Sequence, residues 1–369
     1  MGAVLVPFFT EWANISFTQT MILQSWFMLW VFLLEIPTGT IADYLGRRKS
    51  LALGCIANAA GVIAFTITPN FLLLLLGEFL WAMAIALFSG ADTAITYDSL
   101  RITRQEKESK SVLGKLEISR LTGYMIAAPI GSVIAVTMGL QMPVLLMSIP
   151  LTIGFIITLT LKEPEVKQEI KQKYFSLLKE GAKFFYKHKI LQIIAIDMIV
   201  LNTIGYFIIW LYQPMLQQIG LSIAFFGIIH AAFVASQIFF IKTNKKQETL
   251  LGSKRRVLFA SLIIPGAILI TGGIFLSITI ALIIVFIAGG LALSKKPLFD
   301  SYLNKYIPSE KRATILSTIF MFRTLALVIF NPILGLLAEW SINNTLIIIG
   351  TIAIAFSLLS KIEEKHLID

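Results

Sequence analysis

Long apolar segments alternate with short polar segments along almost the whole chain. Each apolar segment runs for about 20 residues, the length of a helix that crosses the hydrocarbon core of a membrane. The pattern predicts eleven such helices, at residues 21–41, 50–68, 71–100, 111–138, 142–161, 189–216, 222–241, 256–276, 278–304, 312–338 and 342–360. Residues 2–9 are also apolar but too few to span, and residues 11–14 are typical of an outside loop. We expect the true first helix to begin upstream, with Met1 an internal methionine.

Basic residues occupy every second connection between these segments. They lie at 47–49, 101–115, 162–189, 242–256, 305–312 and 361–365, whereas the connections near 68–70, 139–141, 217–222 and 276–279 have no lysine or arginine. Basic loops stay on the cytoplasmic side of a membrane. We therefore expect a multi-pass protein of the plasma membrane with both ends of the full-length chain in the cytoplasm. The net charge of +10 is a topology signal and predicts no nucleic-acid partner.

Composition agrees with an all-α integral membrane protein. Hydrophobic residues make up 57% of the chain and charged residues 14%, against about a quarter charged in soluble domains. The single cysteine, Cys55, excludes a disulfide framework and a cysteine-based metal site. No His-Glu-x-x-His motif, phosphate-binding glycine loop or Ser/His/Asp set at one depth is present, so we expect no enzyme, metal or cofactor. A membrane sensor would need an added soluble domain, and only a short tail, 361–369, follows the last segment.

An internal repeat predicts two halves. Asp98-Ser99-Leu100 ends one apolar segment and Asp300-Ser301-Tyr302-Leu303 ends another, an offset of 300 − 98 = 202. The next segment in each half carries an arginine, Arg120 or Arg323, an offset of 323 − 120 = 203. Such repeats are common among secondary transporters.

The polar stretch between the halves defines the domain boundaries. We expect an N-terminal bundle at 1–161, a cytoplasmic linker at 162–188 and a C-terminal bundle at 189–369. Within the linker, apolar residues recur at helical spacing from Tyr174 to Phe185 with lysines between them. This pattern predicts a basic amphipathic helix on the inner membrane face; a calmodulin-type target would look similar.

The most distinctive motif lies between the first two long segments: Gly39-x-x-Ala42-Asp43-x-x-Gly46-Arg47-Arg48-Lys49. Its glycines would supply flexible backbone where helices enter and leave a short turn. The motif resembles the loop between helices 2 and 3 of the major facilitator superfamily of secondary transporters. The preceding Glu35-Ile36-Pro37-Thr38 resembles the form found in mostly prokaryotic efflux members, as does Gly90-Ala91-Asp92-Thr93-Ala94 with Tyr97-Asp98-Ser99-Leu100.

This resemblance implies the major facilitator fold, two six-helix bundles around a central cavity, here with an incomplete first helix. It also implies that Asp98 meets Arg47 or Arg48 at the inner surface. Asp43 would face the N-terminus of the segment 312–338, where Ser309 is a suitable N-cap. Together these residues would form an inner gate: Gly39, Asp43, Gly46, Arg47, Arg48, Asp98 and Ser309.

Two departures from the family put drug/proton antiport in doubt. Gly77-Glu78 stands in the region of the fourth span where the family has a proton-coupling arginine. The Gly-Pro-x-x-Gly-Gly signature of the fifth span appears only as Ala128-Pro129-Ile130-Gly131-Ser132.

Ionisable residues inside a membrane are functional candidates because burying a charge in hydrocarbon is expensive. For proton coupling, Asp92 is the first candidate, because small residues flank it and no cation lies within one turn. Glu78 shares its helix face about four turns outward, and Glu35 lies in the inner third of its segment. The alternative makes Asp92 a structural partner of a cation in the other half.

A second set of residues is expected to bind substrate or balance charge: Arg323, Lys295, Lys296, Tyr206, Asn202 and His230. Each has a plainer interpretation. One of the two lysines can extend to the inner surface, and the aromatic and amide side chains can make ordinary interhelical contacts. His230 can be a hydrogen-bonded packing residue. Asp197, an acid within the predicted span 189–216, can pair with a loop lysine.

The function we expect is proton-coupled efflux of a small amphipathic compound by a monomer embedded in the lipid bilayer. A carboxylate among apolar neighbours would load and release the coupling proton. The alternative is an importer of a small metabolite with the same fold. In that case Lys295, Lys296 and Arg323 would bind an anionic substrate.

Overall fold

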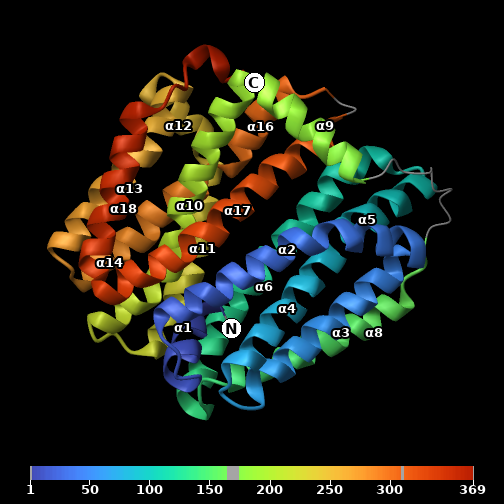
Figure 1. The fold of residues 1–369 in the computed structure, drawn as a ribbon, viewed down its shortest axis with the longest axis horizontal. Helices are drawn as coiled ribbons and strands as arrows, with labels where there is room; N and C mark the ends of the chain where they lie inside the picture. Colours follow the sequence, from blue (N-terminus) through green and yellow to red (C-terminus); the bar gives the residue numbers. More distant parts are fainter. Residues whose placement is uncertain (1, 164–173, 309–310, 369) are drawn as a thin grey trace. The chain divides into compact units, whose positions relative to one another are not determined.

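The computed structural model describes residues 2–163, 174–308 and 311–368, with side chains for these except 35–45, 110, 174–179 and 313. Every regular element in the described ranges is helical (Figure 1). Eleven segments are long and apolar enough to cross a membrane, as the hydropathy pattern predicts. The chain divides into two compact units, Met1–Lys171 with Leu327–Pro332 and Gln172–Ala326 with Ile333–Asp369.

The first unit opens with short helical turns and continues with seven α-helices. The turns are η1 (Gly2–Val4), α1 (Leu5–Pro7) and η2 (Phe8–Trp12), and the helices are α2 (Phe17–Leu45), α3 (Arg47–Thr66), α4 (Phe71–Phe88), α5 (Ala91–Ile102), α6 (Ser109–Met138), α7 (Met142–Leu145) and α8 (Ser148–Thr160), with η3 (Glu106–Glu108) before α6. Glu11 and Trp12, expected in a loop, are helical because η2 continues through them. α4 packs against both α2 and α3.

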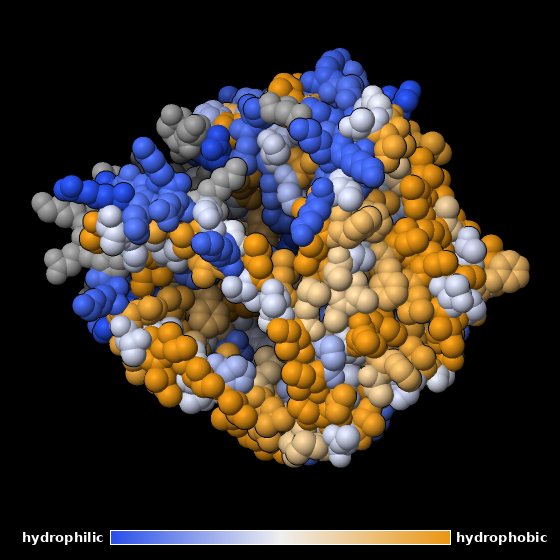
Figure 2. Space-filling model, turned by 180° about the vertical axis from the view of Figure 1, so that it is seen from behind, coloured by the Kyte–Doolittle hydropathy of each residue, from blue (hydrophilic) through white to orange (hydrophobic). Residues whose placement is uncertain are grey.

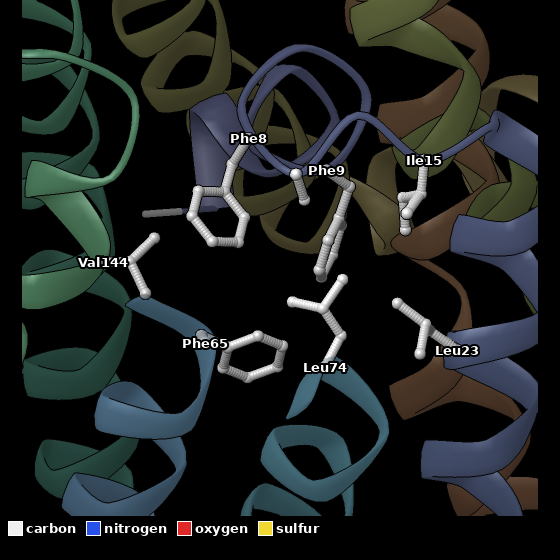
Figure 3. Close-up of a cluster of buried hydrophobic side chains, with 8 residues drawn as sticks. Phe8, Phe9, Ile15, Leu23, Phe65, Leu74 and Val144 are labelled. Atoms are coloured by element: carbon white, nitrogen blue, oxygen red, sulfur yellow. The ribbon is translucent and has the colours of Figure 1, made fainter. Parts of the chain in front are cut away.

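A buried apolar cluster joins the N-terminal turns to the rest of this unit (Figure 3). The Phe65 ring of α3 lies 6.3 Å from that of Phe8 and 5.9 Å from that of Phe9, centroid to centroid. Leu74 of α4 and Val144 of α7 complete the contact. Burying aromatic rings of this size stabilises by about 1.5–3 kcal/mol for each side chain, so the short apolar segment is held in place although it does not span.

The described part of the second unit contains ten α-helices, of which α17 has residues Leu327–Pro332 in the first unit. They are α9 (Tyr174–Lys187), α10 (Lys189–Gln218), α11 (Phe226–Lys242), α12 (Asn244–Leu251), α13 (Lys254–Ile274), α14 (Ile278–Ile283), α15 (Gly290–Leu293), α16 (Lys296–Tyr306), α17 (Arg312–Trp340) and α18 (Ile342–Leu359), with η4 (Ile223–Phe225), the π-turn η5 (Ile284–Gly289) and η7 (Glu364–His366). The linker helix exists as α9, and its Phe185 ring packs 5.3 Å from Phe322 of α17. α12 forms where only a basic loop was expected.

Three predicted spans have a different course. α2 continues to Leu45, so the expected turn shrinks to Gly46 alone, and Gly39 lies inside the helix. The segment 71–100 breaks at Gly90, whose φ of 72° ends α4 and starts α5; a left-handed residue of this kind is readily glycine. The segment 278–304 contains a π-turn and breaks near Ser294.

The surface matches a membrane environment. Figure 2 shows hydrophobic residues over much of one face, with hydrophilic residues gathered toward one edge. Large apolar side chains are widely exposed, among them Leu72 at 73% and Leu359 at 76%. Exposed apolar surface on this scale indicates contact with lipid.

Candidate functional site

The end of the first unit at the α2–α3 turn contains the predicted ion pair. Arg47 Nη1 contacts Asp98 Oδ2, which joins the start of α3 to α5. Asp98 is only 7% exposed, so its charge needs this partner. Arg48 does not share the carboxylate; its Nη1 donates to the Leu161 carbonyl oxygen at 3.3 Å.

Gly46 and Glu163 build the turn between α2 and α3. Gly46 has φ 98° and ψ 151°, a region open essentially to glycine. A Cβ at this position would lie 2.6 Å from Glu163 Oε2. That carboxylate accepts the backbone N–H groups of Arg47 and, at 3.3 Å, Arg48. Glu163 therefore caps the N-terminus of α3, where a negative charge is favoured.

Four predicted residues cannot be tested against this geometry. Glu35, Gly39 and Asp43 lie in residues 35–45 of α2, whose side chains are not described. Ser309 is outside the described ranges. The gate contact predicted for Asp43 and Ser309 stays a prediction.

Glu78 is a second buried acid of the first unit, and its surroundings differ from those of Asp98. It is 2% exposed, and its Oε1 accepts a 2.8 Å hydrogen bond from Gln24 Nε2 across the contact between α4 and α2. Among the described residues no cation pairs with it. Three aromatic side chains lie on the same two helices: Trp26 is 5.4 Å from Trp30, and Trp30 is 4.7 Å from Phe79.

Asp92 does not have the environment that its sequence predicts. The break at Gly90 removes the continuous helix that placed it on one face with Glu78, and Asp92 is exposed in the first turn of α5. Its Oδ1 accepts the N–H of Thr93 at 2.6 Å. An acid in a first helical turn is stabilised by the helix dipole, which accounts for Asp92 without a proton-carrying role.

Lys295 is the buried cation of the second unit. It is 0% exposed, and its Nζ donates to Asn244 Oδ1 and Gln247 Oε1 of α12, both at 2.6 Å. It does not extend to the surface. Its neighbour Lys296 is exposed and pairs at 2.6 Å with Asp300 on the same helix, so the two adjacent lysines differ completely in environment.

Asp197 of α10 is also buried, at 5% exposure. Its Oδ1 accepts from the Ser360 hydroxyl at 2.6 Å. No described lysine forms an ion pair with it, so pairing with a loop lysine is wrong for the described residues.

The other membrane candidates fall into two groups. Asn202 Nδ2 donates to the Met198 carbonyl oxygen of its own helix at 2.8 Å, a local contact. Arg323 of α17 is half-buried, and its guanidinium lies 5.1 Å from the Phe320 ring. In the described part of the chain its Nε has no hydrogen-bond partner and no carboxylate pairs with it.

His230 belongs to a polar cluster between α10 and α11. Its Nδ1 lies 3.0 Å from the hydroxyl of Tyr212, which also accepts from Gln213 Nε2 at 3.1 Å. Tyr212 and Gln213 are both buried. Tyr206 and Trp210, about one turn apart on α10, have ring centroids 6.3 Å apart.

The sequence of residues 1–329 matches the family described as Major Facilitator Superfamily. The chain belongs to the major facilitator superfamily. Members of this family and the solved structures that resemble it are membrane transporters and not enzymes.

Relatives of this facilitator include transporters of several solutes. The "Glucose/galactose transporter" of Brucella abortus biovar 1 (strain 9-941) is 25% identical over 217 residues, 53% of this chain and 50% of that protein. This facilitator thus matches about half the length of its curated relatives. Among solved structures, the nucleoside transporter NupG has a TM-score of 0.81 at 16% identity, with 98% and 95% of the two chains covered. The D-xylose-proton symporter has a TM-score of 0.76 at 12% identity, with 98% of this chain and 93% of that chain covered. These likenesses establish the fold.

Several hydrogen-bond partners of charged residues and helix N-termini were not predicted from the sequence. The amides of Gln24, Asn244 and Gln247 are neutral and distant in sequence from the charges that they bind. Glu163 has a counterpart in Glu364, which accepts the N–H groups of Lys254 and Arg255 at the start of α13, both at 2.9 Å. Their offset, 364 − 163 = 201, is close to that of the internal repeat, and this signal in the sequence could have found both caps.

Proposed function

We propose that this chain couples export of a small amphipathic compound to the proton gradient, with Glu78 as the proton carrier. The observation that carries this proposal is a buried carboxylate whose hydrogen-bond partner is one neutral amide. A bare charge at this depth is costly, and binding a proton removes it.

Gln24 makes both states of Glu78 chemically compatible with the same helix contact. The amide has donors and an acceptor, so it donates to the carboxylate and, after rotation, accepts from the protonated acid. Proton loading therefore changes the charge inside the bundle while α2 and α4 stay joined. In a transporter that alternates by rocking of its two bundles, the neutral form would be the one that crosses between states.

The aromatic side chains beside Glu78 support an amphipathic substrate. Trp26, Trp30 and Phe79 are half-buried, and aromatic faces bind apolar groups strongly. The indole Nε1 of Trp30 is buried, with no hydrogen-bond partner among the described residues.

Uptake of a small polar metabolite is a second candidate. The similarity to the Brucella glucose/galactose transporter favours it, and the cluster of Tyr212, Gln213 and His230 has the donors and acceptors that a polyhydroxylated solute needs. Arg323, without an ion pair among the described residues, would suit an anionic substrate.

The test is the sign of proton movement in liposomes that contain the purified protein and a trapped pH-sensitive dye. Compounds are added outside without a pH gradient: amphipathic amines, glucose, galactose, xylose and nucleosides. Entry by antiport drives protons out and makes the lumen alkaline, whereas symport makes it acidic, whichever way the protein is inserted. We expect alkalinisation with an amphipathic compound to exceed that of protein-free liposomes, which become alkaline when a neutral amine diffuses in and binds protons. Acidification with a sugar or nucleoside would favour the second candidate, and flux of labelled compound without a pH change would overturn proton coupling.

A further inference from the structure

The inner end of α13 carries two adjacent arginines above an apolar helix face. Arg255 and Arg256 lie in its first turn, and both are exposed. The residues one and two turns further on, at spacings of four, are Phe259 with Ile263 and Ala260 with Ile264. All six line one groove of about 380 Å³.

The two guanidinium groups are not neutralised by the protein. Among the described residues neither forms an ion pair. Arg255 lies 4.8 Å from the Phe259 ring, and Arg256 Nη1 donates to the Leu251 carbonyl oxygen at 3.2 Å. Most of their N–H donors therefore remain free for a ligand.

The nearby acids are already engaged. Glu364 accepts backbone N–H groups and the Ser253 hydroxyl. Glu363 bonds to Lys365 at 2.7 Å; this bond chiefly lowers the pKa of Glu363, and Arg255 adds a smaller electrostatic contribution. Arg255 also borders two further grooves, and the surroundings of the three together have five basic side chains against two acidic ones: Lys189, Arg255, Arg256, Lys361 and Lys365 against Glu363 and Glu364.

The first half shows what the second half lacks. There, Asp98 pairs with Arg47. The repeat counterpart of Asp98 is Asp300, which pairs with Lys296 on its own helix at 2.6 Å. Asp300 is therefore engaged on its own helix and does not neutralise the two arginines of α13.

We propose that Arg255 and Arg256 bind the phosphate of an anionic phospholipid in the inner leaflet, with its acyl chains along the apolar face of α13. Arginine pairs bind phosphate through several parallel N–H donors, and basic sites at the cytoplasmic membrane surface recruit anionic lipid. Ile263 and Ile264, 38% and 43% exposed, supply the apolar contact that a free phosphate would not use. This site is independent of the transport reaction.

The proposal is tested by native mass spectrometry of the full chain in detergent, titrated with dioleoyl phosphatidylglycerol or with dioleoyl phosphatidylcholine. We expect selective retention of phosphatidylglycerol by the wild type and at least tenfold weaker binding by R255A/R256A. The matched control is K245A/K246A, which removes the same charge from exposed positions of α12 and should stay within twofold of wild type. R255K/R256K keeps the charge and guards against misfolding; it should retain part of the selectivity.

Three results would overturn the proposal. The first is equal binding of the two lipids by the wild type, and the second is an equal loss of binding in R255A/R256A and K245A/K246A. The third is displacement of the phospholipid by glycerol phosphate at equal concentration, because the apolar face would then contribute nothing.

Discussion

Glu78 in the first unit and Lys295 in the second are both buried and both held by side-chain amides, although their charges are opposite. Glu78 receives one hydrogen bond, from Gln24 at 2.8 Å. Lys295 makes two, to Asn244 and Gln247, each at 2.6 Å. The surrounding chemistry is similar, and the number of bonds differs.

The number of hydrogen bonds distinguishes a residue that can titrate, Glu78, from a residue that holds two helices together, Lys295. A carboxylate with one amide partner can gain a proton and keep its hydrogen bond. Lys295 donates to two acceptors on α12, and removing the group would leave both acceptors unpaired. We therefore interpret Lys295 as the residue that fixes α12 to the start of α16, and Glu78 as the residue that titrates.

Replacing Lys295 should give the largest loss of stability. Lys295→Met keeps the volume but leaves two amide oxygens unsatisfied, one on the buried Asn244 and one on the half-buried Gln247, at a cost of about 3 kcal/mol. The matched control is Lys296→Met, whose ion pair is exposed and should cost less than about 1 kcal/mol. Thermal unfolding in detergent measures both. Equal losses would contradict this role of Lys295.

Glycine substitutions at the two inner turns compare the halves next. Gly46→Ala forces an unfavourable φ and displaces Glu163 from its cap, so we expect a loss of about 2 kcal/mol. At Gly252, φ is 69° and an added Cβ would meet only Arg256 Nη1 at 3.9 Å, so Gly252→Ala should cost about 1 kcal/mol. Denaturation midpoints in detergent measure the stability of the two variants. A larger loss of stability in Gly252→Ala than in Gly46→Ala would contradict this prediction.

The inner arginines should differ by a smaller amount. Arg47→Ala leaves Asp98 without its partner, and because the pair is partly solvated we expect about 1 kcal/mol. Arg255→Ala removes no ion pair and should cost less than about 0.5 kcal/mol in lipid-free detergent. The same unfolding assay applies, and equal effects would contradict the finding that Arg47 forms an ion pair and Arg255 does not.

The smallest expected effect is a dependence of the protein's stability on pH through Glu364. Burial raises the pKa of Glu364, but hydrogen bonds from Ser253 and from the backbone of Arg255 and Lys254 outweigh it, and the net pKa lies below the ordinary 4.5. The ionised form therefore stabilises the docking of η7. This stabilisation is complete above pH 4.5 and is lost as the pH falls through the lowered pKa. The stability gap between wild type and Glu364→Gln should narrow on acidification, and a gap independent of pH would be inconsistent with this role.

The sequence predicts the spans well because hydropathy and the positions of basic residues are summed over many residues. It predicts the Arg47–Asp98 pair through a family resemblance. It fails at Gly90, because small residues inside an apolar run look the same whether they allow close packing or end a helix. That one break moves Asp92 to an exposed first turn and makes Glu78 the stronger candidate.

The neutral partners were harder to foresee. Gln24 lies 54 positions from Glu78, and Asn244 lies 51 from Lys295. Nothing in a single sequence marks an amide as the partner of a particular charge. Tertiary packing decides it, because a buried charge accepts whichever polar group the neighbouring helix presents.

The central claim is that Glu78 carries the coupling proton, and the sharpest test compares Glu78→Gln with Asp197→Asn in liposomes. Both variants neutralise a buried membrane carboxylate with almost no change in volume. With a substrate found by the dye assay, two fluxes are measured: net movement driven by a pH gradient, and exchange of labelled for unlabelled compound without a gradient. We expect Glu78→Gln to lose gradient-driven movement while keeping exchange, and Asp197→Asn to keep both. Gradient-driven movement at the wild-type rate in Glu78→Gln would contradict the account.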